Sequence, residues 1–120
     1  MFMGHYTHSL DDKGRVAIPS EFRGVGENEI SKWVVTQGFD KCLLLRTESE
    51  WEKFVNKVKS LPYSHKKNRL IMRRTIAPAR VVSSDKQGRI LIPQNLREYA
   101  EIDKEVILAG VNTIIEIWSK

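Results

Sequence analysis

The hydrophobic and polar positions of residues 11–23 recur at residues 85–97 without a gap. Both segments have a polar turn, a short alternating strand, a proline and a short amphipathic segment, "DDKGRVAIPSEFR" and "DKQGRILIPQNLR". Self-similarity at only two copies is too little for a solenoid and indicates a pseudo-twofold unit, as if a symmetric dimer were written on one chain. The identical pairs are Asp11/Asp85, Gly14/Gly88, Arg15/Arg89, Ile18/Ile92, Pro19/Pro93 and Arg23/Arg97.

Each copy predicts a hairpin followed by a short helix. In the first copy, residues 5–10 and 15–18 read as strands joined by the turn 11–14, because Asp accepts backbone hydrogen bonds and Gly14 permits a positive φ. Pro19 cannot donate to a strand ladder, so it ends the strand and favours a helix over 20–25. The second copy predicts strands at 80–84 and 89–92, a turn at 85–88 and a helix over 94–100.

A second hairpin follows each copy. Residues 32–46 predict two strands with a turn near Gly38–Lys41, and residues 105–118 predict two strands with a turn near Gly110–Thr113. In the last strand Ile115 and Ile117 alternate with Glu116 and Trp118, which is the period of a half-buried strand.

Helical sequence joins the two copies. Thr47 and Glu50 have the spacing of a capping box, and an apolar stripe at helical spacing follows as far as Pro62. We expect this stripe to pack in the core; it consists of Trp51, Phe54, Val55, Val58 and Leu61. A second helix is predicted from about His65 to Ala77, before Pro78.

These elements predict an α+β fold in which a tandem pseudo-dimer carries peripheral helices. Residues 1–62 form the first repeat with its following helix, residues 63–80 a basic helical connector and residues 81–120 the second repeat. At 120 residues the halves are expected to interlock as one unit.

Composition is that of an ordinary globular chain, with 41% hydrophobic and 29% charged residues. No apolar run is long enough to cross a bilayer, and the first ten residues lack the basic and apolar regions of a signal peptide. Cys42 is the only cysteine, so no disulfide framework exists, as expected of a cytoplasmic protein. Its neighbours "LLL" indicate a small core residue.

The net charge of +5 comes from the second half of the chain. Basic and acidic residues balance in residues 1–60, whereas basic residues exceed acidic ones in residues 61–120. The segment 65–80 holds six Lys and Arg and no acid. This excess permits a polyanionic partner such as nucleic acid, but on charge alone a solvated cationic helix face explains it as well.

The repeated turn carries the candidate chemistry. If Val16 faces the core, alternation turns Arg15 outward, where a guanidinium on a rigid hairpin can read guanine through a bidentate pair of hydrogen bonds. Arg89 is its counterpart, while Lys13 and Lys86 suit phosphate as flexible point charges. The alternative is that both turns only close hairpins and leave the arginines solvated.

Enzymatic chemistry finds little support. His5 and His8 are three apart on a predicted strand and face opposite sides, so they cannot share a metal. There is no phosphate-cradling glycine loop and no H-E-x-x-H motif. We expect no catalytic residue, no metal, no cofactor and no small-molecule substrate.

"MFMGHYTHSLDDKGRVAIPSEFR" resembles the opening of the MraZ family, and "DKQGRILIPQNLREYAEIDKEVILAG…IEIW" resembles its second half. The resemblance runs from Met1 to about Trp118. It implies a tandem AbrB/SpoVT-like swapped-hairpin barrel, and a transcriptional regulator, usually a repressor, of the bacterial division and cell-wall gene cluster. Members usually continue past Trp118 into a C-terminal helical tail.

The resemblance also implies partners and site residues. The family's DNA-contacting turn corresponds to Asp11, Lys13, Gly14 and Arg15, and its second turn to Asp85, Gly88 and Arg89. It implies binding of double-stranded DNA at short direct promoter repeats by a ring-like homo-oligomer in the nucleoid. A ring would multiply weak contacts through multivalency. The alternative function is a ring-forming assembly module without specific DNA readout.

Overall fold

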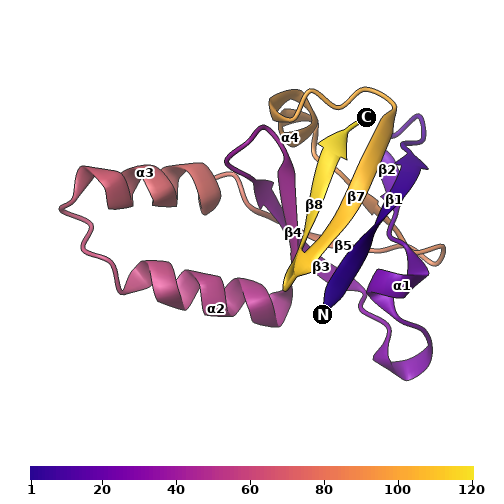
Figure 1. Cartoon of the computed structure of the whole chain (residues 1–120), viewed down its shortest axis with the longest axis horizontal. Coiled ribbons are helices and arrows are strands. Elements are labelled where there is room, and N and C mark those ends of the chain that lie inside the picture. The colour runs from indigo at the N-terminus through magenta and orange to yellow at the C-terminus, as the bar shows by residue number, and fades with distance from the viewer.

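The computed structural model describes residues 1–120 and has an α+β fold, as the sequence predicts. Six antiparallel strands form one sheet in the order β1-β7-β8-β4-β3-β5, and β2 pairs with β6 in a separate two-stranded ladder. The helices α2 and α3 project from this body as an arm (Figure 1).

The first half contains β1 (Phe2–Ser9), β2 (Arg15–Ala17), α1 (Ser20–Arg23), the 3₁₀ turn η1 (Gly26–Asn28), β3 (Lys32–Gln37) and β4 (Leu43–Thr47). The arm follows, with α2 (Glu48–Lys59) and α3 (Lys66–Thr75). The second half contains β5 (Arg80–Ser83), β6 (Arg89–Leu91), α4 (Gln94–Tyr99), β7 (Glu105–Asn112) and β8 (Ile114–Ser119). Pro19 directly precedes α1 and Pro93 directly precedes α4. Their φ values of −52° and −56° suit the start of a helix.

The predicted pairing of the first two strands of each copy is wrong. β1 pairs with β7 and β5 pairs with β3, so each copy's first strand joins the other half. β2 pairs with β6, and the counterparts Val16 and Ile90 lie opposite each other. A turn fixes only the chain reversal, whereas the strand partner is decided by the apolar faces that must be buried together. The halves are therefore interlocked.

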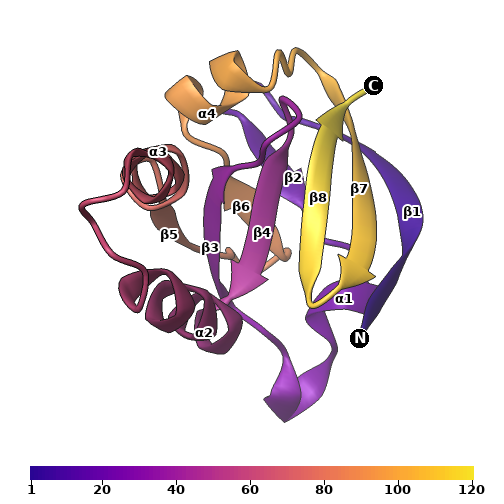
Figure 2. The ribbon, with the colours of Figure 1, turned by 60° about the vertical axis from the view of Figure 1, so that its left-hand side comes forward.

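The two later hairpins are confirmed. β3 pairs with β4 and β7 pairs with β8, while β4 and β8 join the halves in the middle of the sheet. β7 and β8 are separated only by Thr113, next to Asn112 with φ +66°. Figure 2 shows the β4 and β8 ribbons side by side, with the arm to one side of them.

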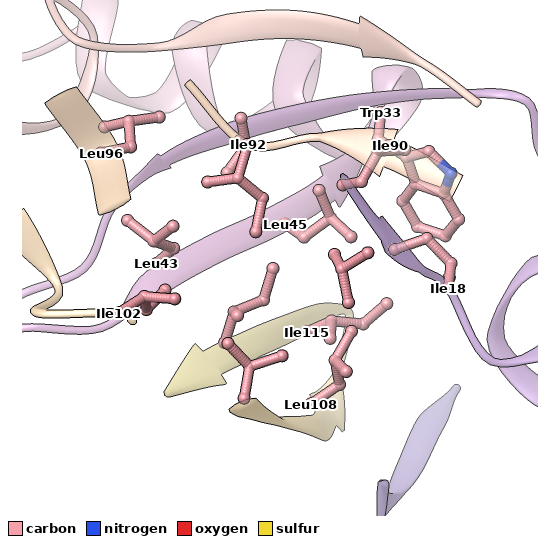
Figure 3. Close-up of a cluster of buried hydrophobic side chains, with 14 of the residues drawn as sticks. Ile18, Trp33, Leu43, Leu45, Ile90, Ile92, Leu96, Ile102, Leu108 and Ile115 are labelled. Carbon is pink, nitrogen blue, oxygen red and sulfur yellow. The ribbon is translucent and has the colours of Figure 1, made fainter. Parts of the chain in front are cut away.

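One hydrophobic core is shared by both halves. Its 17 buried residues form a single cluster, in which Ile18 and Trp33 of the first half lie near Ile90 of the second (Figure 3). Burial of apolar side chains is worth about 1.5–3 kcal/mol each, and the cluster takes its members from both halves. Cys42 is buried as expected, and burial raises the pKa of its thiol to about 11.

The arm corrects one prediction. Thr47 caps α2 by accepting a hydrogen bond from the Glu50 N–H at 3.3 Å, as the capping box predicts. Of the apolar stripe, however, only Val58 is buried, and Leu61 is exposed. The stripe lies outside the core cluster because α2 projects from the sheet instead of lying across it. No helix combines the length and the apolar character needed to cross a membrane.

Candidate nucleic-acid interface

The turns at residues 11–14 and 85–88 are built by the same hydrogen bonds. Asp11 Oδ1 accepts from the N–H of Lys13 at 3.0 Å and of Arg15 at 2.8 Å, and the Gly14 N–H donates to the Asp11 carbonyl at 3.0 Å. Gly14 has φ +84°, where a side chain is strained. The aspartate and glycine of the repeat are therefore requirements of the turn itself.

The second turn repeats this pattern. Asp85 Oδ1 accepts from the N–H of Gln87 at 2.9 Å and of Arg89 at 3.0 Å, and the Gly88 N–H donates to the Asp85 carbonyl at 3.0 Å. Gly88 has φ +75°. The ungapped alignment of the two segments thus corresponds to equal local structure at the turns.

Interlocking brings the two turns together. The Ile18 N–H donates to the Gly88 carbonyl at 2.9 Å, and the Ile92 N–H donates to the Gly14 carbonyl at 3.0 Å. Each turn is therefore held by the strand end of the other half. Because β2 and β6 pair in register, Arg15 and Arg89 start from the same short ladder.

Two arginines and two aspartates form a charged cluster there, which we call the turn quartet: Asp11, Arg15, Asp85 and Arg89. Each arginine Nε–H donates to the aspartate Oδ2 of its own turn, Arg15 to Asp11 at 2.7 Å and Arg89 to Asp85 at 2.9 Å. Across the pair, Arg89 Nη1 lies 3.4 Å from Asp11 Oδ2 and Arg15 Nη1 lies 4.0 Å from Asp85 Oδ2. The quartet holds both guanidinium groups in one orientation.

The quartet keeps its carboxylates ionised. The backbone N–H of Arg15, together with its guanidinium, lowers the pKa of Asp11 to about 2 against an opposing effect of burial. The backbone N–H of Arg89 likewise lowers the pKa of Asp85. Hydrogen bonds to a carboxylate favour its charged form, and both groups are thus negative at neutral pH.

The predicted site residues have unequal surroundings. Lys13 and Lys86 are exposed at the tips of the turns. Arg15 follows the alternation of its strand, since it is partly exposed while its neighbour Val16 is fully buried. The expectation that its side chain is exposed is correct only in part, and the alternative of solvated arginines does not describe either turn. The side chains of Arg15 and Arg89 are only 31% and 29% exposed, because the two aspartates accept their hydrogen bonds.

Arg23 and Arg97 are members of this site that sequence reasoning did not single out. A Cβ on Gly14 would lie 2.7 Å from Cζ of Arg97, and one on Gly88 would lie 2.6 Å from Nε of Arg23. Each turn therefore packs against the arginine of the other half. The repeat alignment contained the signal, since Arg23 and Arg97 are an identical pair, but their contact with the turns required the interlocked fold.

No group of three or more His, Cys, Asp or Glu side chains is placed to hold a metal ion. His8 Nδ1 instead lies 2.7 Å from the Ala17 carbonyl oxygen, which ties β1 to the end of β2. The turns carry two lysines and two ordered guanidinium groups. These groups are suited to binding a polyanion, whereas their arrangement does not indicate catalysis.

Comparison with known proteins identifies the family of the chain. The family model described as "MraZ protein, putative antitoxin-like" matches residues 1–74 and again residues 75–120. A protein of Acetivibrio thermocellus named transcriptional regulator MraZ is 50% identical over 121 residues, covering 100% of this chain and 82% of its own length. Proteins of the same name from Carboxydothermus hydrogenoformans and Thermoanaerobacter pseudethanolicus are 47% and 49% identical, with the same coverage. With both of its halves matched, the chain belongs to the MraZ family.

Proposed function

We propose that the protein is a DNA-binding transcriptional regulator that represses the division and cell-wall gene cluster by binding short direct repeats in its promoter. The name shared by the relatives supports regulation of transcription. The observation that supports DNA binding is the pair of adjacent turns, which carry two exposed lysines at their tips and are followed by two ordered arginines.

The lysines supply attraction to the phosphate backbone. Lys13 and Lys86 are exposed, and an ammonium on a flexible stem suits phosphate without base specificity. Each phosphate contact releases counterions, so the logarithm of the affinity falls with the logarithm of the salt concentration by about 0.9 per contact.

The arginines supply base recognition. In both, Nε–H is used by the aspartate of the same turn, and the cross-turn contacts of Nη1 are longer, at 3.4 and 4.0 Å. Arg89 Nη1 donates one N–H to Asp11 Oδ2, and the other Nη donors remain available for the bidentate pair of hydrogen bonds that reads guanine O6 and N7. Because the quartet already orders Arg15 and Arg89, DNA binding freezes fewer rotamers than it would for solvated arginines.

Several copies act together in this proposal. A ring-like homo-oligomer in the nucleoid of the cytoplasm engages several repeats at once, and multivalency raises the total affinity. Exposed apolar side chains on the arm, among them Tyr63 and Leu70, offer surface for contact between copies. No cofactor or small-molecule substrate is required.

A second candidate is an assembly module whose turns do not read DNA. One observation favours it: Arg15 and Arg89 already have carboxylate partners within the chain, so the presence of arginine in both copies of the repeat has a structural reason. An arginine-to-lysine substitution distinguishes the two functions, because it keeps the positive charge and removes the planar guanidinium. It should abolish the preference for repeat DNA only if the arginine reads bases.

The experiment compares DNA carrying the promoter direct repeats with scrambled DNA of the same length. Arg15→Ala removes a bidentate contact worth about 1–3 kcal/mol per engaged subunit, and a ring multiplies the loss. Arg15→Lys should also lose the preference for repeat DNA while it keeps most of the affinity for scrambled DNA. Lys13→Ala should weaken binding to both DNAs and reduce the salt slope by about 1.

Lys104→Ala is the matched control, because Lys104 is exposed and lies outside the turns. Thermal melting and light scattering on every variant separate loss of recognition from loss of fold or assembly. Retention of full discrimination by Arg15→Ala and Arg15→Lys would exclude the base-reading role and support the assembly module. A mass that stays at the 13.9 kDa of one chain would exclude the ring.

A further inference from the structure

Arg46 is a buried cation without a hydrogen-bond acceptor or salt-bridge partner in the chain. It lies in β4 opposite Val34 of β3 and is only 8% exposed. Its side chain makes no hydrogen bond or salt bridge, and its Nη1 is fully buried without an acceptor. Nearly all buried polar groups in folded proteins are hydrogen-bonded. Trp33 Nε1 and Arg97 Nε are also buried without an acceptor, but of the three residues only Arg46 lines a pocket, where its guanidinium can meet an acceptor from outside the chain.

Two aromatic rings of the arm fix the guanidinium. Its Cζ lies 4.2 Å from the ring centroid of Phe54 and 5.8 Å from that of Trp51. A cation–π contact stabilises the charge through the face of the guanidinium and leaves its N–H edge unused. Burial lowers the pKa of Arg46, while the charge of Glu50 opposes this effect. An arginine remains protonated even then.

Arg46 borders a pocket of about 300 Å³ at the junction of the arm and the body. Lys53 and Lys57 of α2 and Thr113 of the β7–β8 turn line the same pocket. Its only acid is Glu50, and Lys53 Nζ lies 3.1 Å from Glu50 Oε1. Glu50 and Lys53 therefore offset each other, and Arg46 and Lys57 leave the pocket with an excess of positive charge.

We propose that this pocket binds the phosphate group of a small ligand. The N–H edge of Arg46 matches phosphate oxygens, Lys57 adds a second positive charge, and the Thr113 hydroxyl offers a further hydrogen bond. Since α2 belongs to the arm and Thr113 to the second half, such a ligand would tie the two together at a place distinct from the turn quartet.

The test uses the full chain with inorganic phosphate and pyrophosphate as probes, and with chloride at equal ionic strength as the reference. Calorimetry gives the affinity, and thermal melting gives the stabilisation that a ligand of the folded state must produce. We expect both anions to bind and to raise the melting temperature of the wild type above the chloride reference.

Arg46→Met should weaken phosphate binding at least tenfold, while the methionine keeps an apolar contact with the two rings. Lys57→Gln should weaken it severalfold without touching the buried arginine. Lys59→Gln is the matched control, since Lys59 is exposed on the same helix and does not line the pocket, and it should bind as the wild type does. If Arg46→Met does not fold, Lys57→Gln against Lys59→Gln decides the test.

Four results would overturn the proposal. One is the absence of phosphate binding to the wild type. Another is equal stabilisation of all variants, which would be a general salt effect. The third is a fall in oligomer mass for Arg46→Met in a protein that binds no phosphate, because the pocket would then receive a carboxylate of another copy. A repeat-DNA affinity that drops in Arg46→Met without phosphate binding would likewise assign the arginine to the DNA backbone instead.

Discussion

The turns at residues 11–14 and 85–88 have the same backbone hydrogen bonds and different tips. Between aspartate and glycine the first turn carries Asp12 and Lys13, whereas the second carries Lys86 and Gln87. The aspartate, glycine and arginine are fixed because the turn and the quartet need them. The tip residues do not contribute to the turn or the quartet through their side chains, and they differ between the copies. The charges of Asp12 and Lys13 cancel, whereas Lys86 and Gln87 give the second tip a positive charge.

The arginines that cover the turns differ more deeply. Arg23 Nε donates to the Ile18 carbonyl at 2.9 Å and its Nη1 pairs with Glu29 at 2.5 Å. Arg97 Nε is buried without an acceptor. The pseudo-twofold symmetry is therefore close in the backbone and broken in the side chains, and each prediction below tests how far it extends.

The largest effect is expected in the core, where the two halves are equivalent. Ile18→Ala and Ile92→Ala remove fully buried counterparts and should each lower the free energy of unfolding by about 2–5 kcal/mol. Because both belong to one shared core, each variant should unfold in a single transition. Urea denaturation followed by fluorescence measures both quantities. A half that melts separately would show that the halves are independent units.

Alanine substitution at the two turn glycines should lower the stability by different amounts in the two copies. A positive φ costs a non-glycine residue about 1–2 kcal/mol at either position. At Gly88 the new Cβ meets Arg23, which is held by Ile18 and Glu29, while at Gly14 it meets Arg97, whose Nε has no acceptor to lose. Gly88→Ala should thus lower the melting temperature more than Gly14→Ala does. Equal decreases in melting temperature would mean that the new Cβ displaces the Arg23 side chain as easily as the Arg97 side chain.

Methionine substitution of Arg23 and of Arg97, which pack against the turn glycines, should also change the stability of the protein by different amounts. Arg23→Met loses the hydrogen bonds to Ile18 and Glu29 and should lower stability by about 1–3 kcal/mol. Arg97→Met removes a buried donor that has no acceptor and should be neutral or slightly stabilising. Denaturant midpoints of the two variants measure the difference, and the opposite order would contradict the assignment of Arg23 as the anchored member.

The smallest effect concerns acid. The pKa of Asp11 is lowered to about 2, below its ordinary value near 4, so the unfolded state takes up the proton first as pH falls. The stabilisation by ionised Asp11 is present above pH 4 and is lost between about pH 4 and pH 2. Asp11→Asn should accordingly be less stable than the wild type at pH 7, with a gap that closes in this window.

Asp12→Asn provides the control for the acid experiment, because Asp12 is exposed at the tip of the same turn and makes no such hydrogen bonds. Its stability should follow that of the wild type at every pH. Melting temperatures from pH 7 down to pH 2 provide the comparison, and a gap for Asp11→Asn that persists at pH 2 would show that the quartet does not act through the charge of its carboxylate.

Local chemistry determined much of this protein. Asp11 and Gly14 predict a turn, Pro19 ends a strand, and the 3.6-residue period after Thr47 predicts a helix, because each depends on backbone preferences within a few residues. The repeat also predicted two equivalent halves, and the turns that carry Lys13 and Arg15 were placed correctly.

Tertiary structure alone decided which strands pair and what each charge meets. β1 joins β7 and β2 joins β6, because apolar faces distant in the sequence bury more together than neighbouring strands bury alone. That crossing brings Asp11 to Arg89, whereas the projecting arm places two aromatic rings against Arg46 and supplies no acceptor for it. The surroundings of a buried charge depend on residues from several elements at once, and the residue's own sequence neighbours do not contain that information.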